Sequence, residues 1–120
     1  MHLVMGEAKR RKKLDPNYGA EKFRLEFLSE SESNILVGNE LKDFATKQNT
    51  KYYFIQLITE KISIIGVALP FVIGTEIHVK CVWQRLDNKS SQFQNRIINR
   101  HLPQVTKKVA LRLKSELRKK

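Results

Sequence analysis

The sequence has a single cysteine, Cys81, among its 120 residues. One cysteine excludes an internal disulfide, a four-cysteine zinc site and a CxxC redox pair. We therefore expect a reducing compartment and a fold that has no covalent cross-link.

Long apolar runs are also missing. The most apolar stretch, Ile62 to Ile73, is 12 residues long and contains Gly66 and Pro70, whereas a membrane-spanning helix needs about 20 apolar residues. Near the start of the chain no run of about seven apolar residues resembles a secretory signal. These absences predict a cytoplasmic protein without membrane insertion, in which Ile62 to Ile73 forms buried strands separated by a turn at Pro70.

The sequence lacks recognisable catalytic and metal-binding motifs. His2, His78 and His101 do not have the spacing of a metal site, and no G-x-S-x-G, Walker or dinucleotide fingerprint occurs. Cys81 falls on the apolar side of a predicted strand, where a thiol packs as a small hydrophobic group. We therefore expect a protein that is not an enzyme and that needs no metal or cofactor.

Acidic residues are scarce relative to basic ones. The chain has 23 Lys and Arg against 12 Asp and Glu, a net charge of +11. Residues 1–13 have five basic residues and one acid, residues 88–120 have ten and one, and residues 14–87 have eight and ten. Because such an excess repels itself unless an anionic partner screens it, the two ends of the chain are the candidate binding surfaces.

The hydrophobic content of 41% suffices for one folded domain, which we place at residues 20–120 after a basic arm and turn at residues 1–19. Period-two alternation predicts a strand at Phe23, Leu25 and Phe27, with a short helix as the alternative. The polar residues 29–34 predict a loop, and a short helix follows from Glu40 to Gln48, capped by Asn39. Further strands are predicted at residues 51–59, 62–69 and 77–83.

From about residue 92 to residue 118 the pattern becomes helical, because Val105, Val109, Leu113 and Leu117 recur every four residues. Phe93 lies about half a turn from that stripe, so the region is either two helices or one helix kinked at Pro103. The predicted fold is α+β. A small antiparallel sheet, built mainly from residues 51–86 with 23–28 as a further candidate strand, is covered by the basic C-terminal helical region and joined to a flexible basic N-terminal arm.

Basic side chains form the candidate binding surfaces. At 100° per residue, Lys107, Lys114 and Arg118 lie along one line that Arg100 and Arg96 continue, and Lys108, Arg112 and Lys119 lie along a second line. Closely spaced cations opposite an apolar stripe suit phosphate groups, although a solvated helix face is the alternative interpretation. The candidate residues are Lys9, Arg10, Arg11, Lys12, Lys13, Arg96, Arg100, Lys107, Lys108, Arg112, Lys114 and Arg118.

This surface favours a nucleic-acid-binding accessory protein that neutralises phosphates with little sequence specificity. RNA or a ribonucleoprotein is slightly favoured over duplex DNA, because no helix-turn-helix motif is visible. The alternative is an assembly factor that docks on an acidic protein surface. Several aromatic residues are more typical of a core than of a base-stacking platform: Tyr52, Tyr53, Phe54, Trp83 and Phe93.

Met5 to Lys12 (MGEAKRRK) and Asp15 to Gly19 (DPNYG) resemble the opening of many small uncharacterised bacterial proteins, cyanobacterial ones among them. The similarity covers about 15 of the 120 residues. In those proteins the opening precedes different domains, so the resemblance implies a bacterial origin and a basic leader but no activity. It does not extend to residues 20–120.

Overall fold

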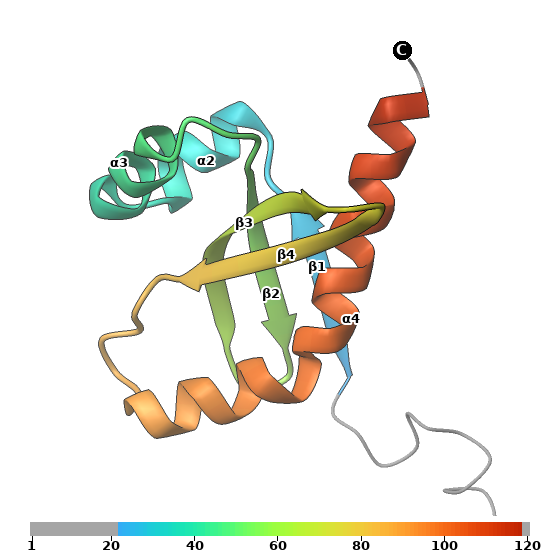
Figure 1. Cartoon of the computed structure of the whole chain (residues 1–120). Helices are drawn as coiled ribbons and strands as arrows, with labels where there is room; N and C mark the ends of the chain where they lie inside the picture. Colours follow the sequence, from blue (N-terminus) through green and yellow to red (C-terminus); the bar gives the residue numbers. More distant parts are fainter. Residues whose placement is uncertain (1–21, 119–120) are drawn as a thin grey trace, which may run out of the picture.

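The computed structural model describes residues 22–118 (Figure 1). The predicted arm and turn at residues 1–19, including Lys9 to Lys13, lie outside the described residues. The described chain forms a four-stranded antiparallel sheet in the order β1-β2-β3-β4, together with three helices. The α+β fold is therefore confirmed.

Consecutive strands pair as neighbours throughout the sheet, as short connections favour. The four strands are β1 (Phe23–Phe27), β2 (Tyr53–Thr59), β3 (Ser63–Ile73) and β4 (Glu76–Trp83). In the pairing register, Leu25 lies opposite Leu57 and Ala68 lies opposite Cys81. The alternation at Phe23, Leu25 and Phe27 thus forms a strand rather than a short helix.

Helices cover both faces of the sheet (Figure 1). On one face α4 (Ser91–Arg118) buries Val105 and Val109 against Ile55 and other residues of β2 and β3. On the other face α3 (Asn39–Lys47) packs Leu41 and other apolar residues against β3, and α2 (Glu30–Leu36) precedes it in the chain. Because successive strand residues point to opposite faces, the central strands supply both cores.

The loop predicted at residues 29–34 is wrong, since this segment begins α2. The Ser29 hydroxyl accepts a hydrogen bond from the Glu32 amide at 3.2 Å, and the Glu32 carboxylate accepts one from the Ser29 amide at 2.8 Å. This reciprocal capping box satisfies two of the backbone N–H groups that a helix N-terminus leaves unpaired. The polar composition therefore starts a helix rather than interrupting one.

The turn predicted at Pro70 is also wrong, because β3 continues through this residue to Ile73. Pairing with β2 ends at Ala68, opposite Tyr53, so at Pro70 the only strand neighbour of β3 within the described residues is β4. Proline is tolerated where no neighbouring strand needs its missing N–H. The turn instead falls at Gly74, whose φ of 63° is a left-handed conformation that favours glycine.

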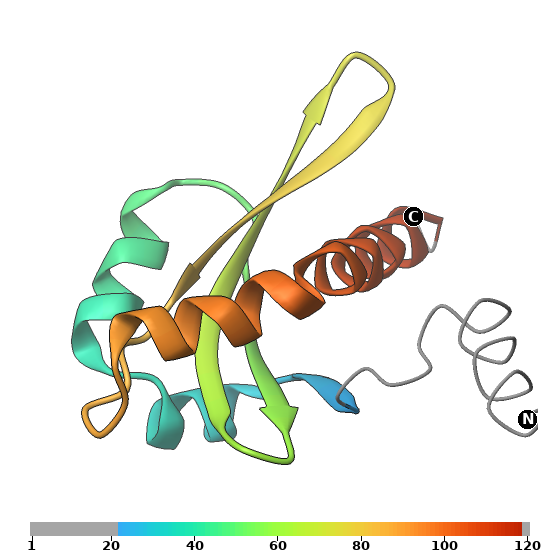
Figure 2. The same ribbon diagram turned by 90° about the horizontal axis from the view of Figure 1, so that it is seen from below.

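The C-terminal region is one helix that contains Pro103, which decides between the two sequence alternatives. Figures 1 and 2 show that α4 changes direction partway along its length, as an internal proline predicts. The predicted apolar stripe is buried at Val105 and Val109, but Leu117 is 52% exposed. The stripe therefore extends beyond the part of α4 that packs on the sheet.

The length of α4 alone does not make it a membrane span. Within residues 22–118, no helix combines the length and the apolar character that crossing a membrane requires.

Candidate nucleic-acid interface

The outer face of α4 carries a row of exposed cations. Lys107 and Lys114 are exposed and lie about half a turn from the buried Val105. Arg96, Arg100 and Arg118 are also exposed. Arg96 and Arg100 precede Pro103, whereas Lys107 and Lys114 follow it, in a helix that changes direction (Figure 1).

The second predicted line of cations is engaged with the sheet. The Lys108 ammonium lies 6.0 Å from the centroid of the Phe23 ring, and the Arg112 guanidinium lies 4.9 Å from that of Phe27. A cation over an aromatic face is attracted by the electron density of the ring. Lys108 and Arg112 therefore help to hold α4 against β1, in addition to contributing positive charge. Lys119, the last residue of this line, lies outside the described residues.

Glu116 is the only acidic residue in α4, and its carboxylate faces the sheet side of the helix. It accepts a 2.6 Å hydrogen bond from the Tyr53 hydroxyl and forms ion pairs with Lys51 at 3.1 Å and Arg112 at 3.2 Å. The Tyr53 hydrogen bond, followed by the contacts with Lys51 and Arg112, lowers the pKa of Glu116 to about 2. The negative charge of α4 is thus fixed beside β2.

The opposite layer of the molecule has the reverse charge balance. The helices α2 and α3 contain four acidic residues against two lysines, namely Glu30, Glu32, Glu40 and Asp43 against Lys42 and Lys47. Within the described residues, the basic excess is therefore concentrated on the α4 layer. A polyanion approaching the α4 face would meet cations without first meeting these carboxylates.

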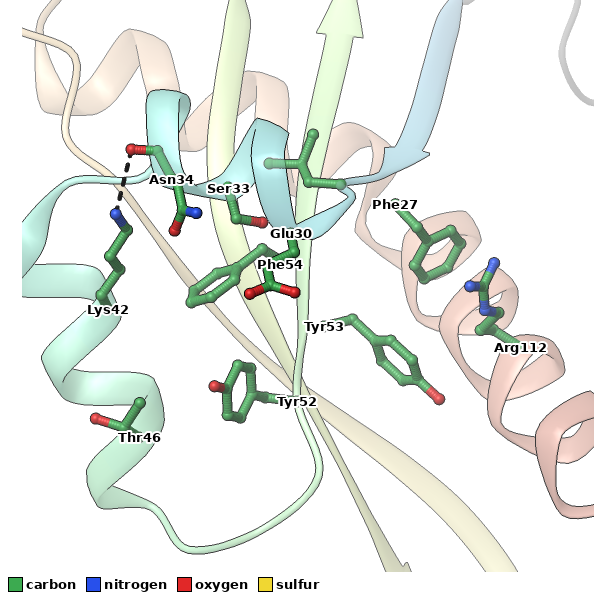
Figure 3. A pocket seen from close by; sticks show the side chains of 11 residues that line it. Phe27, Glu30, Ser33, Asn34, Lys42, Thr46, Tyr52, Tyr53, Phe54 and Arg112 are labelled. Carbon is green, nitrogen blue, oxygen red and sulfur yellow. Dashed lines mark hydrogen bonds between the residues drawn. The ribbon is translucent and has the colours of Figure 1, made fainter.

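A pocket of about 440 Å³ lies between α2, α3 and the start of β2, and Figure 3 shows its lining. The Tyr52 and Phe54 rings are half-buried there, edge to face, with 5.2 Å between their centroids. Glu30 lines the same pocket, and Lys42 donates a hydrogen bond to the Asn34 carbonyl at 3.3 Å. The sequence did not predict this pocket, because it forms where α2 replaces the expected loop.

His2 lies outside the described residues, and within residues 22–118 the other residues considered for catalysis do not form a metal or nucleophile site. His78 lies on β4, and His101 is buried with its ring 4.6 Å from that of Phe23. Burial raises the pKa of the Cys81 thiol to about 11, which keeps it protonated and weakly nucleophilic near neutral pH. Within residues 22–118, no cluster of His, Cys, Asp and Glu is suited to hold a metal ion.

The chain was compared with protein-family models, with curated proteins and with solved structures, and none of the three comparisons finds a match.

Proposed function

We propose that this chain is a non-enzymatic nucleic-acid-binding accessory protein that contacts the phosphates of RNA, or of a ribonucleoprotein, through the outer face of α4. One observation carries the proposal. Lys107 and Lys114 project from the face opposite the buried stripe of α4, while Glu116, the only acid of that helix, is held beside β2. The outer face is therefore cationic without an interspersed carboxylate.

Binding at this face is electrostatic. Each lysine or arginine that neutralises a phosphate releases condensed counterions, so the affinity falls as salt is added. Phosphate contacts of this kind position a protein but do not read bases. We therefore expect binding with little sequence preference and with a steep dependence on salt concentration.

The test is fluorescence anisotropy with a labelled 20-nucleotide oligo-uridine RNA and the nuclease-treated full chain, between about 50 and 300 mM salt. The variant Lys107→Gln/Lys114→Gln removes two cations from the outer face of α4. If both contact phosphates, the slope of log K against log salt becomes shallower by about 1.4, and at 150 mM salt the Kd rises about tenfold.

The matched control is Lys47→Gln/Lys61→Gln, which removes the same charge from exposed residues outside α4. We expect the control to change the Kd much less. Equal effects of the two double variants would show that only the overall charge matters, and binding that does not weaken with salt would overturn the mechanism.

The second candidate function is assembly with an acidic protein partner, because the same exposed cations of α4 also suit carboxylates. A crosslinked pulldown with and without nuclease separates the two functions. Loss of the bound material after nuclease treatment supports nucleic acid, whereas a discrete protein that remains supports the assembly factor.

A further inference from the structure

Strand β4 forms one edge of the sheet. It pairs with β3 at eight consecutive positions, from Glu76 opposite Ile73 to Trp83 opposite Gly66, and no strand lies on its other side within residues 22–118. Edge strands expose backbone N–H and C=O groups, and proteins usually protect them with bulges, prolines, charged side chains or short length. The eight residues of β4 have no proline, and their register has no bulge.

The tip of the hairpin formed by β3 and β4 is apolar and exposed. Phe71, Val72 and Ile73 are 45%, 60% and 59% exposed, and they precede the turn at Gly74. Figure 2 shows the hairpin extending away from the rest of the fold. Contiguous apolar residues on the surface are a mark of an interaction site.

The charges point to a second copy of the chain as the occupant of this surface. Two copies with a net charge of +11 each repel one another over most approaches. Between Ile62 and Val79, however, Glu76 is the only Asp, Glu, Lys or Arg residue. The nearest cations are Lys80 on β4 and Lys107, which lines a pocket with Ile77 and Val79, and Glu76 is the acid available to pair with Lys80 of a second copy.

We propose that two copies of this chain associate by antiparallel pairing of their β4 strands, with His78 opposite His78 of the second copy. A two-fold axis through this point brings Glu76 opposite Lys80 of the second copy, and the symmetry repeats the pair. Opposite charges at directly facing positions stabilise antiparallel strands. A register centred on Val79 brings His78 opposite Lys80 instead, and a register centred on Lys80 opposes two lysines.

This register also places apolar residues of the two copies next to one another. Ile77 lies opposite Val79 of the second copy, and Val72 is the β3 neighbour of Ile77. Val79 lines a pocket of about 410 Å³ together with Thr106, Lys107 and Ala110 of α4. The two β4 strands thus meet beside this pocket in each copy, and both α4 helices lie on one face of a continuous eight-stranded sheet.

Sedimentation equilibrium of the nuclease-treated full chain tests the register through a charge swap. Glu76→Lys gives a chain with lysine at both positions 76 and 80, and Lys80→Glu gives a chain with glutamate at both. Each variant alone opposes like charges twice, so we expect its dimer Kd to rise at least tenfold. An equimolar mixture of the two restores both ion pairs, and we expect a heterodimer with a Kd close to that of the unmodified dimer.

The matched controls are Glu60→Lys and Lys61→Glu, which change the net charge equally outside the hairpin and should leave the dimer Kd unchanged. Circular dichroism establishes that each variant folds, which the exposure of positions 76 and 80 favours. An unmodified chain that is monomeric at 200 µM would overturn the proposal. So would single variants that dimerise normally, or a mixture that does not recover.

A disulfide gives a second measurement of the same register. In a Cys81→Ala background, His78→Cys should crosslink on mild oxidation, because directly opposite positions bring β carbons within about 5.5 Å. Lys80→Cys should not crosslink, since position 80 faces position 76 of the second copy. The reverse result would contradict the proposed register. The proposal is independent of nucleic-acid binding, because both measurements are made without nucleic acid.

Discussion

Arg112 lies over the ring of Phe27, with its guanidinium carbon 4.9 Å from the ring centroid. One helical turn earlier, Lys108 lies near the ring of Phe23. Both rings belong to the edge strand β1, so the two contacts hold the second half of α4 against the sheet. The cations of α4 therefore differ in their surroundings, although they appear equivalent in the sequence.

Comparing substitutions at Arg112 and Lys114 separates the contribution of Arg112 to stability from the effect of its charge. Arg112→Gln removes the contact with Phe27 and the ion pair with Glu116, and we expect the free energy of unfolding to fall by about 1 kcal/mol. Lys114→Gln makes the same charge change on the outer face and should alter stability by less than about 0.5 kcal/mol. Urea denaturation measures both variants. Equal losses of stability would contradict the distinction between the two positions.

The hydrogen bond between Tyr53 and Glu116 makes stability depend on acidic pH. The pKa of Glu116 falls from its ordinary 4.5 to about 2 in the folded chain, so its stabilising effect is complete above pH 4.5 and is lost as the pH drops through 2. Tyr53→Phe removes the largest cause of this shift. We expect the variant to lose about 1 kcal/mol at pH 7 and to show a smaller further loss between pH 4.5 and 2.

Urea unfolding at several pH values between 2 and 7 measures this difference. Glu116→Gln is the control, because it has no carboxyl group to titrate at this position. It should also reduce the loss in the free energy of unfolding between pH 4.5 and 2. Parallel pH profiles for the unmodified chain and Tyr53→Phe would show that this hydrogen bond does not set the pKa of Glu116.

The capping box of α2 predicts the effect of replacing Ser29. Ser29→Ala removes the acceptor for the Glu32 amide, and we expect a loss of about 1 kcal/mol in the free energy of unfolding. Ser31→Ala removes the hydrogen bond between the Ser31 and Ser29 hydroxyls at 3.2 Å but leaves the acceptor for the Glu32 amide in place, so it should cost less. Denaturant titration compares the two, and a larger effect at Ser31 would refute the role given to Ser29.

Gly66 has no room for a side chain, because a β carbon there would lie 2.4 Å from Cε3 of Trp83. Gly66→Ala therefore has to displace the indole, and we expect a cost of about 1 to 3 kcal/mol. Trp83 is the only tryptophan, so its fluorescence should also shift. Adding Trp83→Leu should reduce the cost of the alanine, whereas additive losses would exclude a clash as its cause.

Local patterns in the sequence predict most of the fold. The alternation at Ile77, Val79 and Cys81 correctly predicts β4, and the period of Val105 and Val109 correctly predicts the buried face of α4. The capping box at Ser29 was missed because its serines and glutamates also suit a loop. The course of β3 through Pro70 depends on where β2 ends, and no local pattern contains that information.

The candidate site was predictable to a similar degree. Helical periodicity gives the two lines of cations on α4, but it does not show that Arg112 meets Phe27, a residue 85 positions earlier in the chain. The aromatic pocket beside Tyr52 likewise depends on α2 and β2 coming together. Both features arise from contacts between distant segments, which single-sequence patterns do not specify.

Because α4 changes direction, a polymer that binds along the whole length of this helix has to bend with it. A strand that contacts Arg96 and Arg118 together has to turn with the helix. A single-stranded chain turns at little cost, whereas a duplex, with a persistence length of about 150 base pairs, resists bending over so short a distance. The position of Pro103 would in this way discriminate between flexible and stiff polyanions, although the proline itself carries no charge.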